Sequence, residues 1–330
     1  MRILRWPAAV LPFLLVAGCG ESPTLAGSTM ASGHGALLVY RTAAQPGLPY
    51  HSEWTAIDPE SGASLGRVNW MPSAGVLSEF TFSRDGNWIA WDEPIDAPLQ
   101  PWDGCDFTDV CGPQQLSRNL YVAHVGESSR INVTPQYSYD RMPSFSPDGD
   151  RLVLIRGSYD SQEQMISIRR DGGDVRALLP KSLRRRDRPD WSPRSQQILY
   201  SRPDIGALYA VDADGKNPRA LTDTFVQVGP ATWSPDGALI AVAIRNRPIR
   251  RGNYYEFTAE RFLGLLRPDG SVMAKIPIQR EPYLRAVWSP DGSRVVTCDD
   301  AGIRITAVAT GESRQITPAG YYDCPVLWRP

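Results

Sequence analysis

One segment of the sequence matches the nucleophile elbow of serine hydrolases. It runs from Gly62 to Gly66 with Ser64 at its centre, and in such enzymes this serine attacks an acyl carbon from a sharp strand-to-helix turn. Here the segment lies between two β-rich runs, where a hairpin turn accounts for its glycines. The motif therefore does not predict an acyl-transfer enzyme.

The residue types that bind metals are also poorly placed. The three histidines, His34, His51 and His124, show no metal-ligand spacing. The segment from Asp212 to Asn217 begins like a calcium loop, but it lacks the distal glutamate and falls at an expected turn. We predict no metal ion and no cofactor.

Composition excludes several classes of protein. The 330 residues include 35 Lys and Arg against 36 Asp and Glu, for a net charge of −1, and 42% of them are hydrophobic. This balance predicts a folded body and argues against a general nucleic-acid binder. Glycine (28 residues) and proline (29 residues) together make up about a sixth of the chain, which favours many short elements joined by tight turns.

The N-terminus has the features of an exported lipoprotein. After a basic start, the apolar run that ends at Val16 is shorter than the ~20 residues that span a bilayer. Leu-Val-Ala-Gly then precedes Cys19, which resembles the bacterial lipobox, and the resemblance implies that Cys19 is diacylated. We expect a signal peptide over residues 1–18 and a flexible tether over 19–35. Because Gly20 follows the cysteine, the resemblance implies an anchor in the outer membrane, on its periplasmic side or at its surface.

A repeated pattern occupies the rest of the chain: an aromatic residue followed by a serine-led tight turn. In Ser-Pro-Asp-Gly the proline presets φ, the Asp or Ser accepts local backbone bonds, and the glycine adopts a left-handed conformation. Each copy predicts a hairpin whose incoming strand ends at the aromatic anchor. The anchors are Phe82, Phe145, Trp191, Trp233, Trp288 and Trp328, the last of which begins a copy cut off by the chain end.

Two more strands follow each hairpin, as at residues 207–215 and 218–222. Anchor spacings of 63, 46, 42, 55 and 40 residues fit four-stranded propeller blades with two insertions. The last copy has only a first strand, whereas the chain after the tether begins with a second, third and fourth strand. We therefore predict an all-β, six-bladed β-propeller over residues 36–330, closed when the C-terminal strand completes the N-terminal blade.

The repeats resemble the WD-related repeat of the TolB propeller family over about Ala36 to Pro330. The resemblance implies a propeller in the cell envelope, although TolB carries an additional N-terminal α/β domain and is a soluble periplasmic protein. Related propellers also precede prolyl peptidase domains and occur in pectate-fragment lyases. The motif is specific for the propeller class and says little about function.

Four cysteines besides Cys19 predict disulfides, because their number is even in an exported chain. Cys105 and Cys111 lie in one insertion. Cys298 ends a second strand and Cys324 begins the first strand of the neighbouring blade, which brings both to one face of a propeller. We therefore predict the pairs 105–111 and 298–324.

Charged loops should polarise one face of such a propeller. Loops between second and third strands and loops between blades share a face, and two basic loops fall there. The basic residues that we expect to bind a partner are Arg184, Arg185, Arg186, Arg188, Arg245, Arg247, Arg250 and Arg251. The acids of the first insertion fall about half a ring away: Asp92, Glu93, Asp96, Asp103, Asp106 and Asp109. Solvated loop charge is the simpler alternative to a docking surface.

The leading hypothesis is a monomeric, membrane-anchored lipoprotein whose non-catalytic propeller binds a protein or cell-envelope component. It would contact the membrane through its lipid anchor only and would not bind nucleic acid. Two alternatives stay open: a glycan- or peptide-processing enzyme, either a lyase or a hydrolase, and a small-ligand sensor that uses the channel. Acid-base groups for an enzyme would come from residues that precede the anchors: Glu79, Arg141, Asp187, Arg188 and Arg285.

Overall fold

The structure is a computed structural model that describes most of the chain between Gly35 and Arg329. The described residues are 35–43, 51–68, 79–94, 118–135, 139–157, 163–179, 188–202, 206–222, 225–246, 249–251, 254–256, 261–278, 286–299, 302–317 and 324–329. Within these ranges there is no helix long and apolar enough to cross a membrane. The predicted signal peptide, the first disulfide and all of the predicted tether except Gly35, which is buried, lie outside the described residues.

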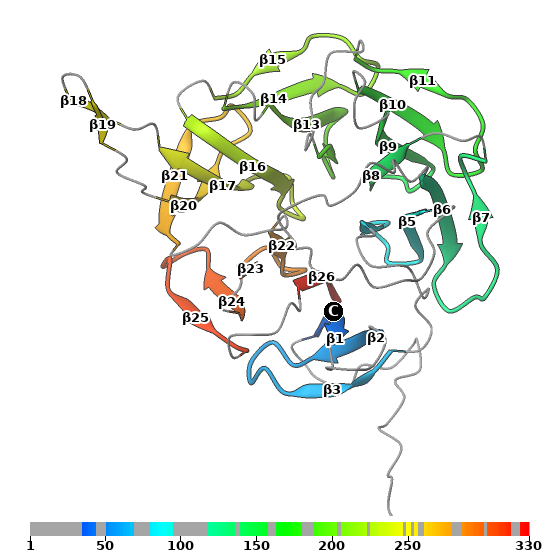
Figure 1. The fold of residues 1–330 in the computed structure, drawn as a ribbon, viewed down its shortest axis with the longest axis horizontal. Helices are drawn as coiled ribbons and strands as arrows, with labels where there is room; N and C mark the ends of the chain where they lie inside the picture. Colours follow the sequence, from blue (N-terminus) through cyan, green and yellow to red (C-terminus); the bar gives the residue numbers. More distant parts are fainter. Residues whose placement is uncertain are drawn as a thin grey trace, which may run out of the picture.

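Six four-stranded antiparallel sheets form a ring of blades (Figure 1). From the inside outwards, blade 1 contains β26 (Cys324–Arg329), β1 (Ala36–Ala43), β2 (His51–Ile57) and β3 (Ser64–Arg67). Blade 2 contains β4 (Phe80–Phe82), β5 (Trp88–Pro94), β6 (Arg118–His124) and β7 (Ile131–Asn132). Blade 3 contains β8 (Asp140–Phe145), β9 (Arg151–Arg156), β10 (Gln164–Arg169) and β11 (Arg176–Ala177).

The second half of the ring repeats this order. Blade 4 contains β12 (Asp190–Trp191), β13 (Gln197–Arg202), β14 (Ala207–Asp212) and β15 (Arg219–Ala220). Blade 5 contains β16 (Phe225–Trp233), β17 (Ile240–Asn246), β20 (Arg261–Leu266) and β21 (Val272–Pro277), with an inserted hairpin of β18 (Ile249–Arg251) and β19 (Tyr254–Glu256). Blade 6 contains β22 (Val287–Trp288), β23 (Arg294–Asp299), β24 (Gly302–Ala307) and β25 (Ser313–Gln315). The predicted six-bladed propeller is confirmed.

The Ser-Pro-Asp-Gly turns are held by the same side-chain contacts in several blades. In blade 3, Ser146 Oγ donates to Asp148 Oδ1 at 2.5 Å and accepts from Arg151 N at 2.9 Å, while Gly149 has a φ of 74°. The same two contacts recur in the turns led by Ser83, Ser234 and Ser289. In each of these turns the serine hydroxyl lowers the pKa of the turn aspartate, so the carboxylate stays ionised at neutral pH.

The C-terminal strand closes the ring, as the repeat pattern predicts. β26 pairs antiparallel with β1, and the register places Leu37 opposite Trp328 and Leu38 opposite Leu327. Trp328 packs in the core between blades 1 and 6, beside Val296 of β23. The two ends of the propeller are therefore joined within one blade.

Anchor aromatics fill the spaces between neighbouring blades. Trp233 of β16 packs with Leu199 of β13 and Ile240 of β17, in the core between blades 4 and 5. The four anchor tryptophans are between 3% and 8% exposed: Trp191, Trp233, Trp288 and Trp328. These rings are structural, and they do not form an exposed sugar-binding platform.

Truncating the last anchor tests this closure. Trp328→Ala should lower the free energy of unfolding by about 3–5 kcal/mol, because it leaves a cavity at the seam of the ring. The matched control is Val175→Ala on an exposed side chain (50% exposed), which should change it by no more than about 0.5 kcal/mol. Urea unfolding followed by tryptophan fluorescence and circular dichroism measures both, and equal effects would contradict a seam at β26.

Candidate functional site

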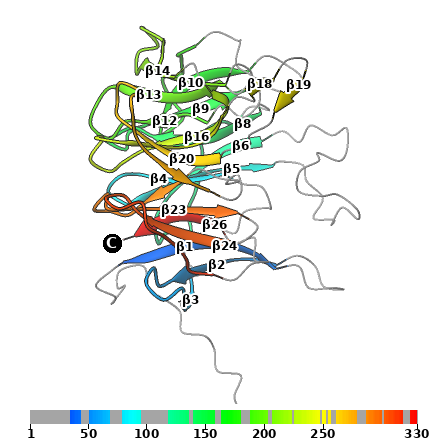
Figure 2. The ribbon, with the colours of Figure 1, turned by 90° about the vertical axis from the view of Figure 1, so that its left-hand side faces the viewer.

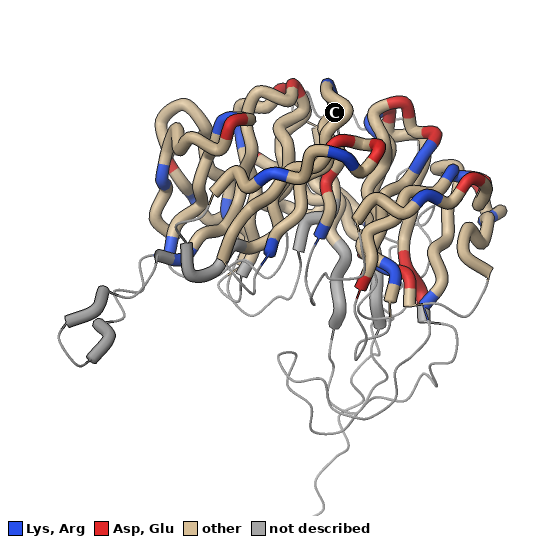
Figure 3. Tube along the Cα trace, turned by 90° about the horizontal axis from the view of Figure 1, so that it is seen from above, with Lys and Arg blue, Asp and Glu red and all other residues tan. Residues whose placement is uncertain are grey.

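The two faces of the ring differ in the connections that form them. Hairpin turns between first and second strands, and between third and fourth strands, make the turn face. Connections between second and third strands, and between blades, make the loop face. Figure 2 shows the ring from its edge, with the C-terminal end of β26 on the turn-face side and the β18–β19 hairpin on the opposite side. Figure 3 shows acidic and basic residues interspersed along both faces.

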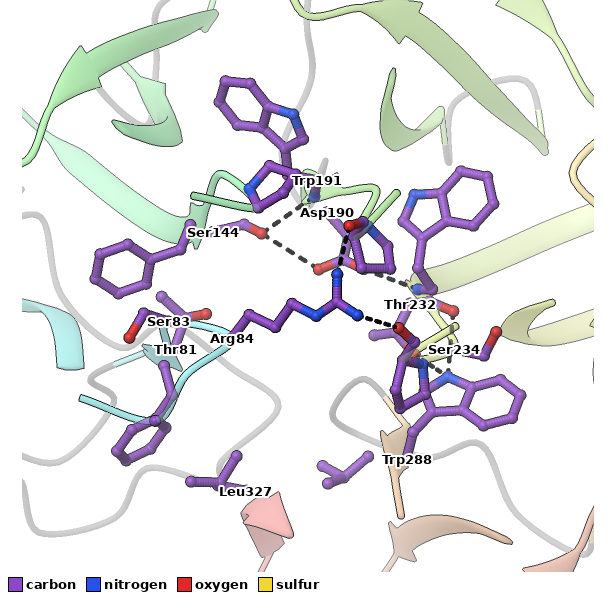
Figure 4. A pocket seen from close by; sticks show the side chains of 18 of the residues that line it. Thr81, Ser83, Arg84, Ser144, Asp190, Trp191, Thr232, Ser234, Trp288 and Leu327 are labelled. Carbon is purple, nitrogen blue, oxygen red and sulfur yellow. Dashed lines mark hydrogen bonds between the residues drawn. The ribbon is translucent and has the colours of Figure 1, made fainter. Parts of the chain in front are cut away.

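A pocket of about 580 Å³ opens where the six inner strands meet at the turn face. The residue before each anchor lines it, and these residues differ around the ring (Figure 4). Blades 2 to 5 contribute polar side chains: Thr81, Ser144, Asp190 and Thr232. Blades 6 and 1 contribute Val287 and Leu327. The wall of the pocket is therefore polar on one side and apolar on the other.

The polar residues also join each blade to the next. Ser144 Oγ accepts the backbone N–H of Trp191 at 3.2 Å and donates to Asp190 Oδ1 at 3.3 Å. Asp190 Oδ2 accepts the backbone N–H of Trp233 at 2.8 Å. Thr232 Oγ1 accepts from Trp288 Nε1 at 3.1 Å. This belt of hydrogen bonds fixes the inner strands of blades 3 to 6.

Arg84 extends across the mouth of the pocket. It stands in the turn of blade 2 at the position where the other turns have proline. Its Nη1 donates to the carbonyl oxygen of Pro193 at 2.7 Å and its Nη2 to that of Pro235 at 3.4 Å, so it reaches from blade 2 to blades 4 and 5 (Figure 4). The repeat pattern did not predict this role, although arginine replaces proline in this one turn.

Blade 2 contains a buried ion pair toward the loop face. Arg118 Nε lies 2.5 Å from Asp92 Oδ2, and the two side chains are 8% and 2% exposed. Asp92 Oδ1 also accepts the backbone N–H of Glu79 at 2.6 Å. Burial raises the pKa of Asp92, with a smaller contribution from the Glu79 carboxylate, and Arg118 opposes this rise. Arg118 is therefore the group that favours the ionised form of Asp92.

Glu79 connects blade 2 with blade 4. Its carboxylate forms an ion pair with Arg188, which precedes β12, and their side chains are 25% and 14% exposed. Because blade 3 lies between these two blades, the pair reaches past it at the loop-face end of the channel. The charge of Arg188 is therefore matched inside the ring.

Blade 3 has two further ion pairs at the same end. Asp140 is fully buried and accepts from Arg156 Nε at 2.9 Å and from its Nη2 at 2.8 Å. These hydrogen bonds raise the pKa of Arg156. Arg141 pairs with Glu163, and their side chains are 8% and 3% exposed. A bulge in β8 follows Arg141, where Met142 has a positive φ of 58°.

The structure describes part of the predicted arginine set. Arg188 forms the ion pair with Glu79, and Arg245 lies at the loop-face end of β17, where its backbone pairs with Arg261. Arg250 and Arg251 lie in β18. Arg184, Arg185, Arg186 and Arg247 lie outside the described residues, as do Asp187 and Arg285 of the enzyme alternative.

Two of the predicted surface acids belong to the ring itself, so the expectation that they polarise the loop face is wrong. Asp92 is buried against Arg118. Glu93 accepts from Trp91 Nε1 at 3.2 Å and lies 2.5 Å from Arg130. Residues at the end of a strand that continues into an insertion can still face the core, and the sequence pattern does not show where the strand ends. The other four acids of the insertion lie outside the described residues.

The remaining predicted residues are structural where they are described. Cys298 is 5% exposed and disulfide-bonded. The side chain of Cys324 is outside the described set, so the pair 298–324 stays a prediction, as does 105–111. The elbow-like segment forms the β2–β3 hairpin, where Gly62 has a φ of 73° and closely approaches the backbone of Ile316. Among the described residues, no three His, Cys, Asp or Glu residues come together as metal ligands.

Comparisons with known proteins support the fold. No protein-family model matches the chain. A segment of 111 residues is 26% identical to the uncharacterized peptidase YuxL of Bacillus subtilis (strain 168), and the match covers 31% of this chain and 17% of the length of that relative.

Solved structures match over most of the propeller. TolB from Acinetobacter baumannii has a TM-score of 0.61 at 15% identity, covering 90% of this chain and 67% of TolB. A chain of a nidogen/laminin complex also has a TM-score of 0.61, at 12% identity, covering 87% of this chain and 96% of that one. Oligogalacturonate lyase in complex with manganese has a TM-score of 0.52 at 13% identity, covering 81% and 71%. The fold is TolB-like, and it is shared by proteins with different functions.

The buried pair in blade 2 allows a direct test of its energetics. Arg118→Met should lower the free energy of unfolding by about 3–5 kcal/mol at pH 7, because Asp92 is left as an uncompensated buried charge. Adding Asp92→Asn should recover part of this loss, since no buried charge then remains. Chemical unfolding of the two single variants and the double variant gives the coupling energy, and strictly additive losses would contradict the pair.

Proposed function

We propose that the protein is a cell-envelope binding scaffold, anchored by lipid at Cys19, that docks a protein or envelope partner on its loop face and catalyses no reaction. The fold supports a rigid body with a fixed surface, since the anchors and the hydrogen-bond belt couple each blade to its neighbours. A rigid surface loses little conformational entropy when it binds a partner.

The proposal rests on the difference between the paired charges inside the ring and the excess of basic residues in two loops. The described carboxylates at the loop face, such as Asp92, Asp140 and Glu163, are matched by arginines within the ring.

Two of the loops instead carry excess positive charge, whereas the insertion over residues 95–117 holds four acids and no base. Without Arg188, which pairs with Glu79, residues 181–187 hold four basic side chains and one acid, and residues 245–251 hold four basic side chains and no acid. This surplus favours a negatively charged partner.

The insertion in blade 5 displays part of that surplus. Arg250 and Arg251 lie in β18, and the β18–β19 hairpin stands out from the ring (Figure 1). A protruding hairpin reaches a partner without requiring the blades to move. The TolB and nidogen/laminin structures support the use of such a ring for binding, whereas the lyase structure keeps an enzyme or a channel sensor as the rival.

The docking surface can be tested by removing its charge. Changing Arg184, Arg185, Arg186, Arg247 and Arg250 to Ser should lower capture of envelope partners at least ~10-fold and remove its salt dependence. The matched control changes five exposed turn-face arginines to Ser: Arg169, Arg176, Arg194, Arg219 and Arg267. Capture should survive in this control. Turnover of an envelope glycan or peptide that is lost in Glu79→Gln, with capture equal in both arginine sets, would instead support the enzyme.

The lipid anchor has a separate test. The native sequence should incorporate labelled palmitate and partition into detergent, because the residues before Cys19 resemble a lipobox. Cys19→Ser should abolish labelling and release the protein from membranes, whereas Ser22→Ala, a change in the tether, should leave both unchanged. Native protein that takes up no label would refute the anchor and leave the propeller and its docking surface untouched.

A further inference from the structure

The turn-face pocket has charged side chains that would suit a bound cation. Among the described residues that line it, only Arg84, Asp85 and Asp190 are charged. Arg84 belongs to the protein's own turn, so the rest of the pocket has two carboxylates and no cation. A ligand that entered the pocket in place of the Arg84 side chain would therefore meet negative charge.

Two backbone oxygens add to this character. In the turn of blade 5, the carbonyl of Ser234 accepts the N–H of Gly237 at 2.8 Å. The following carbonyl, that of Pro235, is left for another donor, and Arg84 supplies it. Pro193 in blade 4 is the second acceptor for the same guanidinium. These two carbonyls belong to different blades but face the same guanidinium. A planar cation with several N–H groups can therefore bind both.

Four of the inner-strand turns carry an aspartate, and one of these, Asp85, lines the pocket. The turn aspartates Asp85, Asp148, Asp236 and Asp291 follow the inner strands of four blades. Each accepts a hydrogen bond from the serine of its own turn, and the pKa of Asp291 is lowered to about 2. Besides the serine, a nearby arginine lowers the pKa of each of the other three aspartates: Arg151, Arg194 and Arg294 act on Asp148, Asp236 and Asp291 in turn. Asp85 is therefore the turn carboxylate that favours a cation at the pocket.

Arg84 is itself only loosely fixed. Its side chain is exposed, and among the described residues it contacts the two carbonyls and forms no ion pair. The ion pairs near the loop face differ in this respect, since each of their arginines faces a carboxylate. The Arg84 side chain can therefore move away from the pocket mouth without leaving a buried carboxylate unpaired.

We propose that the turn-face pocket binds a guanidinium ligand and that Arg84 is its built-in competitor. The occupied carbonyls show that a guanidinium fits, and Asp190, together with the Asp85 side of the rim, supplies the countercharge. The apolar wall at Val287 and Leu327 can pack against the aliphatic stem of the ligand. The ligand is either an arginine side chain of a polypeptide or a small guanidinium molecule. The site lies on the face opposite the arginine loops, so this proposal and the docking surface can fail independently.

Competition explains how such a pocket would be regulated. A guanidinium on a short tether has an effective concentration of roughly millimolar, so an external ligand must exceed this to displace it. Removing Arg84 therefore raises the apparent affinity for the external guanidinium. The same change would abolish binding if Arg84 instead held an anion.

The test uses isothermal calorimetry on the full chain with two guanidinium probes, acetyl-Gly-Arg-Gly-amide and agmatine. Arg84→Ala should bind at least one of them ~10-fold or more tightly than the native protein does. The citrulline analogue of the peptide, which is uncharged, should not bind. Arg194→Ala, a change at an exposed arginine of the same face that does not line the pocket, should behave as the native protein. Stronger binding of the peptide indicates a polypeptide ligand, and stronger binding of agmatine indicates a small molecule.

A second variant tests the countercharge. Asp190→Asn in the Arg84→Ala background should weaken guanidinium binding at least ~10-fold. Asp85→Asn serves the same purpose if thermal melting shows that Asp190→Asn, which also holds Trp233, unfolds the ring. No gain in affinity on removing Arg84 would overturn the proposal. Binding of phosphate or acetate to the native protein that is lost in Arg84→Ala would overturn it as well, and would identify an anion site.

Discussion

The pairing of β26 with β1 is the interaction on which the rest of the structure depends. A propeller blade buries both of its faces only against its two neighbours, so an open ring would expose a blade face and a strand edge. Residues from opposite ends of the chain meet in one register here, and Trp328 fills the seam between blades 1 and 6. Every pocket, ion pair and loop of the channel is positioned relative to this closed ring.

Closure gives the channel two chemically different ends. Toward the loop face, arginines and carboxylates are matched in pairs, including the Glu79–Arg188 pair between non-neighbouring blades. At the turn face, the serine-bound Asp85 stays ionised at a pocket that a single arginine crosses. Among the described residues, the ion pairs at the first end are structural. The second has acceptors for a cation and a side chain that already occupies them.

Much of the fold could be predicted from the sequence because each blade repeats the same local chemistry. The anchor and the turn serine recur, and the incomplete copy at Trp328 revealed the closure. The contacts inside the ring could not be predicted in this way. Glu79 and Arg188 are far apart in sequence, and Asp92 and Glu93 were expected at the surface because they begin an insertion. Polar residues such as Ser144 and Asp190 directly precede the anchors. The sequence does not show that they form hydrogen bonds between neighbouring blades, because these contacts exist only when the inner strands lie side by side.

The central claim is that the ring is a scaffold that engages its partner through the loop face. The most direct measurement is site-specific photo-crosslinking in intact cell envelopes, with the photoreactive residue at Ile249 in the loop-face hairpin or at Val175 on the turn face. The account predicts a discrete protein or envelope adduct from position 249 and none from position 175. An adduct from position 175 alone, or none from either, would contradict docking through the loop face.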